Sequence, residues 1–160
     1  MAIRIGQGID FHRLVEGRPL VLGGINIPHH KGALGHSDAD VLLHAICDAF
    51  LGALALGDIG THFPDSDPAF KDIDSKILLE KTISMIRSKG FHAENIDCTV
   101  CLETPKIKPY VMDMRKTIAS ITGNTIETIS IKATTTEELG FVGREEGIMA
   151  QATVLLTDQN

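Results

Sequence analysis

Apolar residues that alternate with polar ones predict the strands of this chain. The longest such run lies near the C-terminal end, where every second position is apolar: Ile148, Ala150, Ala152, Val154 and Leu156. Successive side chains of a strand point to opposite faces, so this pattern predicts a strand over Gly147–Leu156 with one apolar face. Shorter runs predict further strands over Ile3–Gly8, Leu20–Ile27, Ile96–Glu103 and Ser130–Ala133.

Helix signals occur three times between these strands. Helices are expected to begin after Ser37, after Asp74 and near Pro109, and to end at Gly57, Gly90 and Gly123. Polar residues at the start and glycines at the end are the usual boundaries of helices. Three helices with four or five strands predict an α/β or α+β fold.

The sheet is expected to be covered by helices on one side only. The second face of the last strand carries Gln151, Thr153 and Thr157, which are neither strongly apolar nor charged. This face is therefore expected to contact partner subunits.

Composition narrows the class of protein. The 160 residues are 43% hydrophobic, which suffices for one core, so we expect a single domain over residues 1–160. The net charge is −6 and the basic residues are scattered, which argues against a nucleic-acid surface.

The first residues resemble neither a secretory signal nor a transit peptide, and no apolar run is long enough for a membrane span. A cytoplasmic bacterial protein is expected.

The three cysteines do not indicate a disulfide framework. An odd count fits reduced thiols, and Cys98 and Cys101 form a single C-x-x-C within a predicted strand. Side chains three apart on a strand face opposite sides, so these two thiols are interpreted as structural.

A candidate metal site begins at Asp10 and His12, which point to the same side of an extended segment. The best source of a third ligand is the helix opened by "GHSDADVLLH", where Asp40, His44 and Asp48 recur every four residues. One carboxylate and two imidazoles suit zinc with an open fourth position, and Asp48 or Asp40 is expected to orient His44. The alternative is a chance D-x-H pair and a half-buried structural histidine.

Two junctions between a loop or strand and a helix are candidate phosphate sites. His36 and Ser37 precede one helix, and free backbone N–H groups at a helix start attract anions. Thr134, Thr135 and Thr136 end another strand, and Glu137 is expected to begin a short helix and to hold Mg²⁺. The alternative is two ordinary capped helix starts, with Asp40 completing a capping box from Ser37.

Other motifs are incomplete or have no clear partner. The chain lacks the P-loop, the G-x-G-x-x-G and the EF-hand patterns. The remaining histidines, His29, His30, His62 and His92, are treated as surface residues. The loop from His62 to Ser75 is rich in Asp and is either a lid or a simple connection.

Taken in order, the segments "GIDFH", "LGGINIP", "HSDADVLLHAICDAFLGALALGDIGTHFPDSDPAFK", "TPK" and "IKATTTEELGFVGREEGI" closely resemble the bacterial 2-C-methyl-D-erythritol 2,4-cyclodiphosphate synthase family. The resemblance covers essentially the whole chain. It implies a mixed sheet with helices on one face and the other face toward a threefold axis. It also implies a homotrimer with active sites between subunits.

The resemblance implies roles for individual residues. Asp10, His12 and His44 correspond to the ligands of one zinc ion per chain, and Glu137 to the ligand of a second cation, Mg²⁺ or Mn²⁺. His36 and Thr135 correspond to transition-state stabilisers. The substrate-contacting positions are His36, Ser37, Asp58, Ile59, Gly60, Phe63, Pro64, Asp65, Ser66, Asp67, Leu102, Pro105, Lys106, Ile107, Lys108, Ala133, Thr134, Thr135, Thr136 and Glu137. Phe141 and Arg144 resemble positions near a central cavity that in some members holds an isoprenoid diphosphate.

The activity implied is that of a phosphorus–oxygen lyase of non-mevalonate isoprenoid biosynthesis. Its substrate is 4-diphosphocytidyl-2-C-methyl-D-erythritol 2-phosphate, and its products are the 2,4-cyclodiphosphate and CMP. Two alternatives remain on the residues alone. One is a zinc-dependent phosphohydrolase, and the other is a metal-dependent protein that binds isoprenoid diphosphates without turnover.

Overall fold

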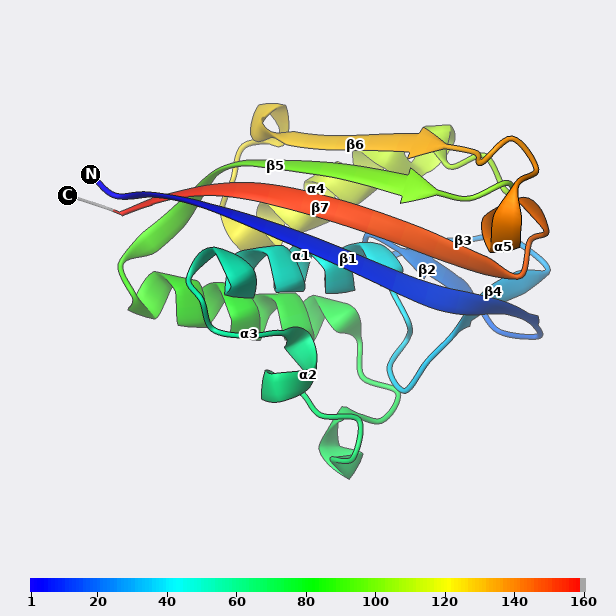
Figure 1. Ribbon diagram of the computed structural model, residues 1–160, viewed down its shortest axis with the longest axis horizontal. Helices are drawn as coiled ribbons and strands as arrows, with labels where there is room; N and C mark the ends of the chain where they lie inside the picture. The colour runs from blue at the N-terminus through cyan, green and yellow to red at the C-terminus, as the bar shows by residue number, and fades with distance from the viewer. Residues whose placement is uncertain (159–160) are drawn as a thin grey trace.

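The computed structural model describes residues 1–158 and contains one five-stranded sheet (Figure 1). Its strand order is β4-β1-β7-β5-β6, formed by Lys31–Leu34, Ile3–Glu16, Gly147–Asp158, Phe91–Cys101 and Ile129–Thr134. The β5–β6 pair is parallel and the other three pairs are antiparallel, so the sheet is mixed, as expected. A separate hairpin pairs β2 (Leu20–Leu22) with β3 (Ile25–Ile27).

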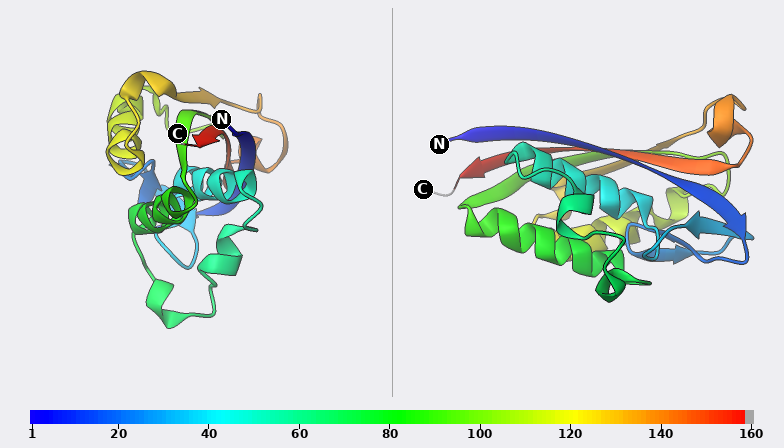
Figure 2. Two further views of the ribbon diagram at one scale, coloured as in Figure 1. Left: turned by 90° about the vertical axis from the view of Figure 1, so that its left-hand side faces the viewer. Right: turned by 60° about the horizontal axis from the view of Figure 1, so that its bottom comes forward.

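Helices α1 (Val41–Ala53), α3 (Ser75–Ser88) and α4 (Val111–Thr122) lie on one face of the sheet (Figure 2). Two shorter helices, α2 (Ile59–His62) and α5 (Gly140–Gly143), lie in connections. Other connections contain short 3-10 helices: η1 (Pro68–Phe70), η2 (Lys108–Tyr110) and η3 (Ile126–Thr128). No helix in residues 1–158 is long and apolar enough to cross a membrane.

Two strand predictions need correction, and one strand was not predicted. Strand β1 does not stop at Gly8 but continues to Glu16, because its backbone pairs with β7 as far as Arg13 and with β4 beyond that point. The predicted strand Leu20–Ile27 is a hairpin, since Gly23 and Gly24 take positive φ values of 57° and 76° and reverse the chain. Strand β4 was not predicted, because its four residues carry no alternation.

The start of α1 also differs from the prediction. Its N-cap is Asp40 and not Ser37: one carboxylate oxygen of Asp40 accepts the Leu43 N–H at 3.0 Å. The same carboxylate accepts the N–H groups of Gly23 at 3.0 Å and Gly24 at 2.7 Å. Asp40 therefore joins the helix to the β2–β3 turn, and its burial raises its pKa to about 6.

Strand β1 packs directly on α1 at two glycines. A Cβ atom placed on Gly6 would lie 1.8 Å from the Ala49 carbonyl oxygen, and one on Gly8 would lie 2.0 Å from that of Ala45. Only residues without a side chain fit at this distance. The remaining core consists of apolar residues of α1, α3, α4 and the covered face of the sheet.

The opposite face of the sheet is open within one chain, as predicted. Ile3, Ile5, Ile9 and Phe11 of β1 project from it, with 47–70% of their surface exposed. An exposed apolar row of this kind on a sheet indicates contact with another protein surface.

The cysteines are free, as expected. Cys98 is buried and Cys101 is half-buried, consistent with side chains on opposite faces of β5. Burial raises the pKa of Cys98, and likewise of Cys47, to about 12, so neither thiol is reactive near neutral pH.

We expect Gly8→Ala to destabilise the protein by about 2–3 kcal/mol or more, because the added methyl group would collide with the α1 backbone. Gly52→Ala is the matched control on α1, where a Cβ meets only the Gln7 carbonyl oxygen at 3.7 Å. Alanine there should be neutral or stabilise the helix by up to ~1 kcal/mol. Equal effects in urea unfolding would contradict the direct packing of β1 on α1.

Asp40 should make stability depend on pH. Its folded pKa of about 6 lies above the ordinary value of 3.8, so the folded state binds the proton more tightly. Relative to Asp40→Asn, the wild type should therefore lose on the order of 2–3 kcal/mol as pH rises from about 4 to about 6. Above that window the difference should stay constant. Parallel pH profiles of the free energy of unfolding would contradict the raised pKa.

Candidate functional site

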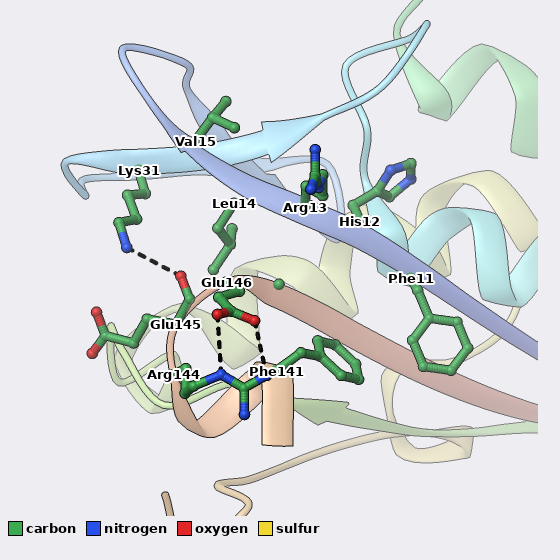
Figure 3. A pocket seen from close by; sticks show the side chains of 11 residues that line it. Phe11, His12, Arg13, Leu14, Val15, Lys31, Phe141, Arg144, Glu145 and Glu146 are labelled. Atoms are coloured by element: carbon green, nitrogen blue, oxygen red, sulfur yellow. Dashed lines mark hydrogen bonds and ion pairs between the residues drawn. The ribbon is translucent and has the colours of Figure 1, made fainter. Parts of the chain in front are cut away.

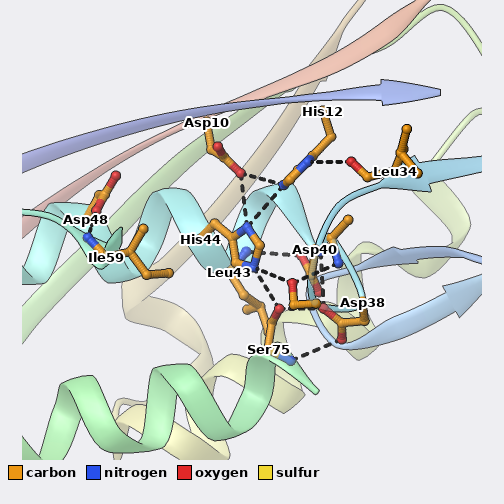
Figure 4. Close-up of polar contacts among 12 residues, drawn as sticks. Asp10, His12, Leu34, Asp38, Asp40, Leu43, His44, Asp48, Ile59 and Ser75 are labelled. Atoms are coloured by element: carbon orange, nitrogen blue, oxygen red, sulfur yellow. Dashed lines mark hydrogen bonds and ion pairs between the residues drawn. The ribbon is translucent and has the colours of Figure 1, made fainter. Parts of the chain in front are cut away.

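Three side chains from two elements converge on one point. Asp10 and His12 point from β1 toward α1, and His44 points from α1 toward them (Figure 4). The distance from Asp10 Oδ2 is 3.0 Å to His12 Nε2 and 3.1 Å to His44 Nδ1, and the two nitrogens are 3.1 Å apart. The prediction that these residues meet is confirmed.

The contact of His12 Nδ1 with the backbone fixes which ring nitrogen faces Asp10 and His44. His12 Nδ1 lies 3.0 Å from the Leu34 carbonyl oxygen, which can only accept, so Nδ1 carries the proton and donates it. Nε2 is therefore the atom that faces Asp10: in the neutral ring it presents a lone pair, and in the protonated ring it donates to the carboxylate. This is the arrangement of a histidine that binds a metal.

The contacts among Asp10, His12 and His44 shift pKa values toward an ionised Asp10 carboxylate and a protonated His12 imidazole. Burial alone would raise the pKa of Asp10, but the hydrogen bonds and charges of His12 and His44 hold it well below its usual range. Burial alone would lower the pKa of His12, but the Asp10 carboxylate raises it above the ordinary value. Asp10 is therefore an anion that attracts a positive charge at this point.

The donor set fits a divalent metal ion. A carboxylate oxygen and two imidazole nitrogens lie mutually within 4.8 Å, and in the described residues they are the only such group. Ligands of tetrahedral zinc are separated by about 3.3 Å, close to the spacing seen here. The three residues could hold such an ion and leave one position open.

Asp10, His12 and His44 line a cavity of about 470 Å³. Its lining combines the three residues with the loop before α1 and the segment around α2: Asp10, His12, Gly35, His36, Ser37, His44, Ile59, Gly60, Phe63, Pro64, Asp65, Phe70, Ile73 and Leu78. His36 and Ser37 thus line the same cavity as Asp10, His12 and His44. The predicted loop from His62 to Ser75 forms one wall.

The residues that orient His44 differ from the prediction. Asp40 is occupied at the β2–β3 turn, and Asp48 Oδ1 accepts the Ile59 N–H at 2.7 Å, so neither reaches the ring. His44 Nε2 instead lies 2.9 Å from Ser75 Oγ and 3.2 Å from Ser37 Oγ. No sequence spacing indicated Ser75, which is 31 positions from His44.

Asp58 directly precedes Ile59 and Gly60, which line the cavity. It caps α2, where Asp58 Oδ1 accepts from the Thr61 N–H at 2.9 Å and from the Thr61 hydroxyl at 2.8 Å. Asp67 caps the η1 turn in the same way through Ala69 N–H. Asp58, Ser66 and Asp67 do not line the cavity.

The second group of predicted site residues lies at the other edge of the sheet. Residues 102–108 follow β5 and residues 133–137 end or follow β6, and none of them lines the cavity. Strand β6 is three strands from β1, or about 14 Å. A single chain therefore does not bring the two groups together.

The loops after β5 and β6 are tied to each other. Glu103 Oε1 accepts the Thr136 N–H at 2.8 Å and the Thr136 hydroxyl at 3.1 Å, a link that the sequence did not indicate. The prediction that Glu137 begins a helix is wrong, because its φ is 53° and α5 begins at Gly140. Among residues 1–158, its exposed carboxylate accepts only the Thr135 hydroxyl, at 3.2 Å.

Phe141 and Arg144 line a different cavity, of about 780 Å³ (Figure 3). The Phe141 ring lies 5.9 Å from the Phe11 ring, and Arg144 pairs with Glu146 through two contacts of 3.0 Å. Lys31 Nζ donates to the Glu145 carbonyl oxygen at 3.1 Å across the same cavity. The cavity therefore has an aromatic side and a charged side.

The treatment of the remaining histidines as surface residues is only partly correct. His30 is exposed, but His29, His62 and His92 are half-buried. His62 contacts the Leu56 carbonyl oxygen at 2.8 Å, and His92 pairs with Glu94 at 3.1 Å. The Thr157 hydroxyl donates to the same Glu94 oxygen at 2.6 Å.

Comparison of the sequence with protein families finds the YgbB family over residues 3–157. A curated relative from Bacillus mycoides (strain KBAB4) is 60% identical over 153 residues, which are 96% of this chain and 97% of the relative. A relative from Bacillus anthracis (strain CDC 684 / NRRL 3495) has the same identity and coverage. Both are named 2-C-methyl-D-erythritol 2,4-cyclodiphosphate synthase.

Solved structures show the same fold. The bifunctional IspDF from Campylobacter jejuni matches with a TM-score of 0.95 and 42% identity over 99% of this chain, which spans 43% of that protein. The CDP complex of IspF from Plasmodium falciparum matches with a TM-score of 0.87 and 36% identity over 99% of this chain and 98% of that one. On the sequence match, the fold and the near-complete coverage together, the chain belongs to the YgbB family of 2-C-methyl-D-erythritol 2,4-cyclodiphosphate synthases.

Proposed function

We propose that this protein converts 4-diphosphocytidyl-2-C-methyl-D-erythritol 2-phosphate to 2-C-methyl-D-erythritol 2,4-cyclodiphosphate and CMP. The observation that carries the proposal is the convergence of Asp10 Oδ2, His12 Nε2 and His44 Nδ1 beside a cavity, in a chain of this family. In this reaction an oxygen of the 2-phosphate attacks the β-phosphorus. The bond from that phosphorus to the bridging oxygen breaks, and CMP leaves with the electron pair.

Asp10, His12 and His44 would hold a zinc ion, one per chain. Zinc supplies a Lewis acid that polarises a phosphoryl oxygen and offsets its charge. The residues themselves bring one negative charge and two neutral donors to the cavity. The enzyme needs no nucleophile of its own, since both reacting phosphates belong to the substrate, so its contribution is alignment and charge stabilisation.

His36 and Ser37 would bind the phosphate beside this centre. His36 Nε2 is buried and has no hydrogen-bond partner among the described residues, although His36 lines the cavity. A buried polar atom without a partner is unfavourable, and a phosphate oxygen would satisfy it. His36, together with Thr135, is proposed to stabilise the transition state.

The methylerythritol part would lie against Asp58, Ile59 and Gly60, with residues 63–67 closing over it. Ile59 and Gly60 line the cavity, and Asp58 holds α2 in place. Asp48 holds the same segment in place, because its carboxylate accepts the Ile59 N–H.

The cytidine part and the second cation would be bound by the loops after β5 and β6. Residues 102–108 and 133–135 would form the cytidine pocket, and Glu137 would hold Mg²⁺ or Mn²⁺. Because these loops are three strands from β1, we propose that they act on the cavity of a neighbouring subunit in a homotrimer. The exposed apolar row of β1 on the open face would form part of that interface. An isoprenoid diphosphate is proposed as a further ligand near Phe141 and Arg144.

The reaction can be followed by ³¹P NMR of the purified protein with the diphosphocytidyl substrate, Zn²⁺ and Mg²⁺ in H₂¹⁸O. We expect two coupled diphosphate signals of a cyclic product, stoichiometric CMP and no ¹⁸O in either product. A linear product that contains ¹⁸O would instead identify a phosphohydrolase. An unchanged spectrum despite tight ligand binding would identify a binding protein.

His44→Ala should lose zinc and activity, because two ligands from β1 alone bind zinc far more weakly than three. The fold should persist, since a smaller side chain leaves the glycine contacts of α1 intact. Metal content after gel filtration and circular dichroism check both expectations. His30→Ala, at an exposed histidine, is the control. Full zinc content in His44→Ala would rule out the proposed ligand set.

A further inference from the structure

We propose that Arg18 is a positioning residue that clamps residues 33–37, the segment that carries His36 and Ser37 to the wall of the cavity. The inference rests on the proposed phosphate-binding role of His36 and Ser37, and it adds the group that sets their position. Arg18 lies in the connection between β1 and β2 and does not itself line the cavity.

The clamp consists of two hydrogen bonds from one guanidinium group. Arg18 Nε donates to the Ala33 carbonyl oxygen at 2.9 Å, and Arg18 Nη2 donates to the Ser37 carbonyl oxygen at 3.2 Å. The two N–H groups belong to one planar and rigid fork, which in other settings holds the two oxygens of a carboxylate. Here the fork holds two backbone oxygens four residues apart, so it keeps the ends of the segment close together.

The residues between the two clamped carbonyl groups shape the site. The Leu34 carbonyl oxygen lies 3.0 Å from His12 Nδ1 (Figure 4). Gly35 packs against the same ring, because a Cβ atom on Gly35 would lie 3.0 Å from His12 Cε1. Gly35, His36 and Ser37 line the cavity. A shift of the segment would therefore displace three cavity residues and the backbone contact of His12 together.

Close backbone packing fixes the start of the Arg18 side chain. A Cβ atom on Gly32 of β4 would lie 2.1 Å from the Pro19 carbonyl oxygen and 2.3 Å from that of Arg18. The connection between β1 and β2 therefore lies directly against β4, one residue before Ala33. The half-buried Arg18 side chain thus begins at a fixed point beside the segment that it holds.

Phosphate binding in this cavity depends on where His36 and Ser37 lie. None of the residues that line the cavity is a lysine or an arginine, so no long cationic side chain can follow a displaced phosphate. The chain just after Ser37 is also strained, because the buried Ala39 has a φ of 58°, in the left-handed region. A strained connection keeps its conformation only where neighbouring contacts hold it, and the Arg18 fork supplies one on each side of residues 34–36.

The test compares variants of the full-length, zinc-loaded protein with pyrophosphate as the probe. Arg18→Met keeps the apolar stem and removes every donor, whereas Arg18→Lys keeps the positive charge but not the fork. Arg115→Met is the matched control. Arg115 is also half-buried, and its Nη2 donates to the Ile126 carbonyl oxygen at 2.6 Å, away from the cavity. It reports what a lost contact between an arginine and the backbone does to the fold alone.

We expect the dissociation constant for pyrophosphate, measured by calorimetry, to rise about 5- to 10-fold in both Arg18 variants, because His36 and Ser37 are no longer held in place. It should stay within about twofold of the wild type in Arg115→Met. Amide hydrogen exchange of residues 33–37, measured without pyrophosphate, should become faster in the two Arg18 variants only. Urea unfolding should show a similar loss of stability in Arg18→Met and Arg115→Met, so global stability would not explain the difference.

An affinity of Arg18→Met within about twofold of the control would overturn the proposal. Wild-type affinity in Arg18→Lys would also overturn it, because the charge and not the fork would then be responsible. The same holds for a wild type that does not bind pyrophosphate, since there would be no anion site to position. Weakened pyrophosphate binding in the Arg18 variants of a protein whose wild type releases no CMP would support the clamp and contradict the proposed function.

Discussion

Strand β1 and helix α1 touch backbone to backbone at Gly6 and Gly8, and the site depends on this contact. Two residues along a strand advance about 6.6 Å and four along a helix advance about 6.0 Å, so the two elements stay in step. The inward positions after Gly8 are Asp10 and His12, and they arrive opposite the first turn of α1, where His44 lies. The absence of side chains at the glycines is what lets atoms on separate elements approach to about 3 Å.

The two histidines of the site are oriented in the same way by the protein around them. Each histidine has its second nitrogen committed to a protein oxygen, Leu34 O for His12 and Ser75 Oγ for His44. The inner nitrogens face an anionic Asp10, to which they donate when protonated and beside which they would present lone pairs to a metal ion. Two lone pairs and a carboxylate at this spacing repel one another unless a positive charge lies between them, which explains why the arrangement suits a metal ion.

Much of the site could be predicted because it follows local rules. The period of two places Asp10 and His12 together, and the residue types of α1 single out His44. The polar inner residues that make the site also interrupt the apolar alternation, so the predicted strand ended at Gly8, before it reached the functional residues. Ser75 and the partners of Asp40 could not be predicted, because their contacts depend on where α3 and the β2–β3 turn pack against α1.

The most direct test of the metal centre is zinc K-edge X-ray absorption of the zinc-loaded protein. The account predicts four light ligands at about 2.0–2.2 Å, with the multiple-scattering pattern of two imidazoles. The fourth ligand should be exchangeable, so added pyrophosphate should perturb the spectrum while both imidazole signals persist. A sulfur neighbour at about 2.3 Å, or fewer than two imidazoles, would contradict the assignment of Asp10, His12 and His44 as the metal centre.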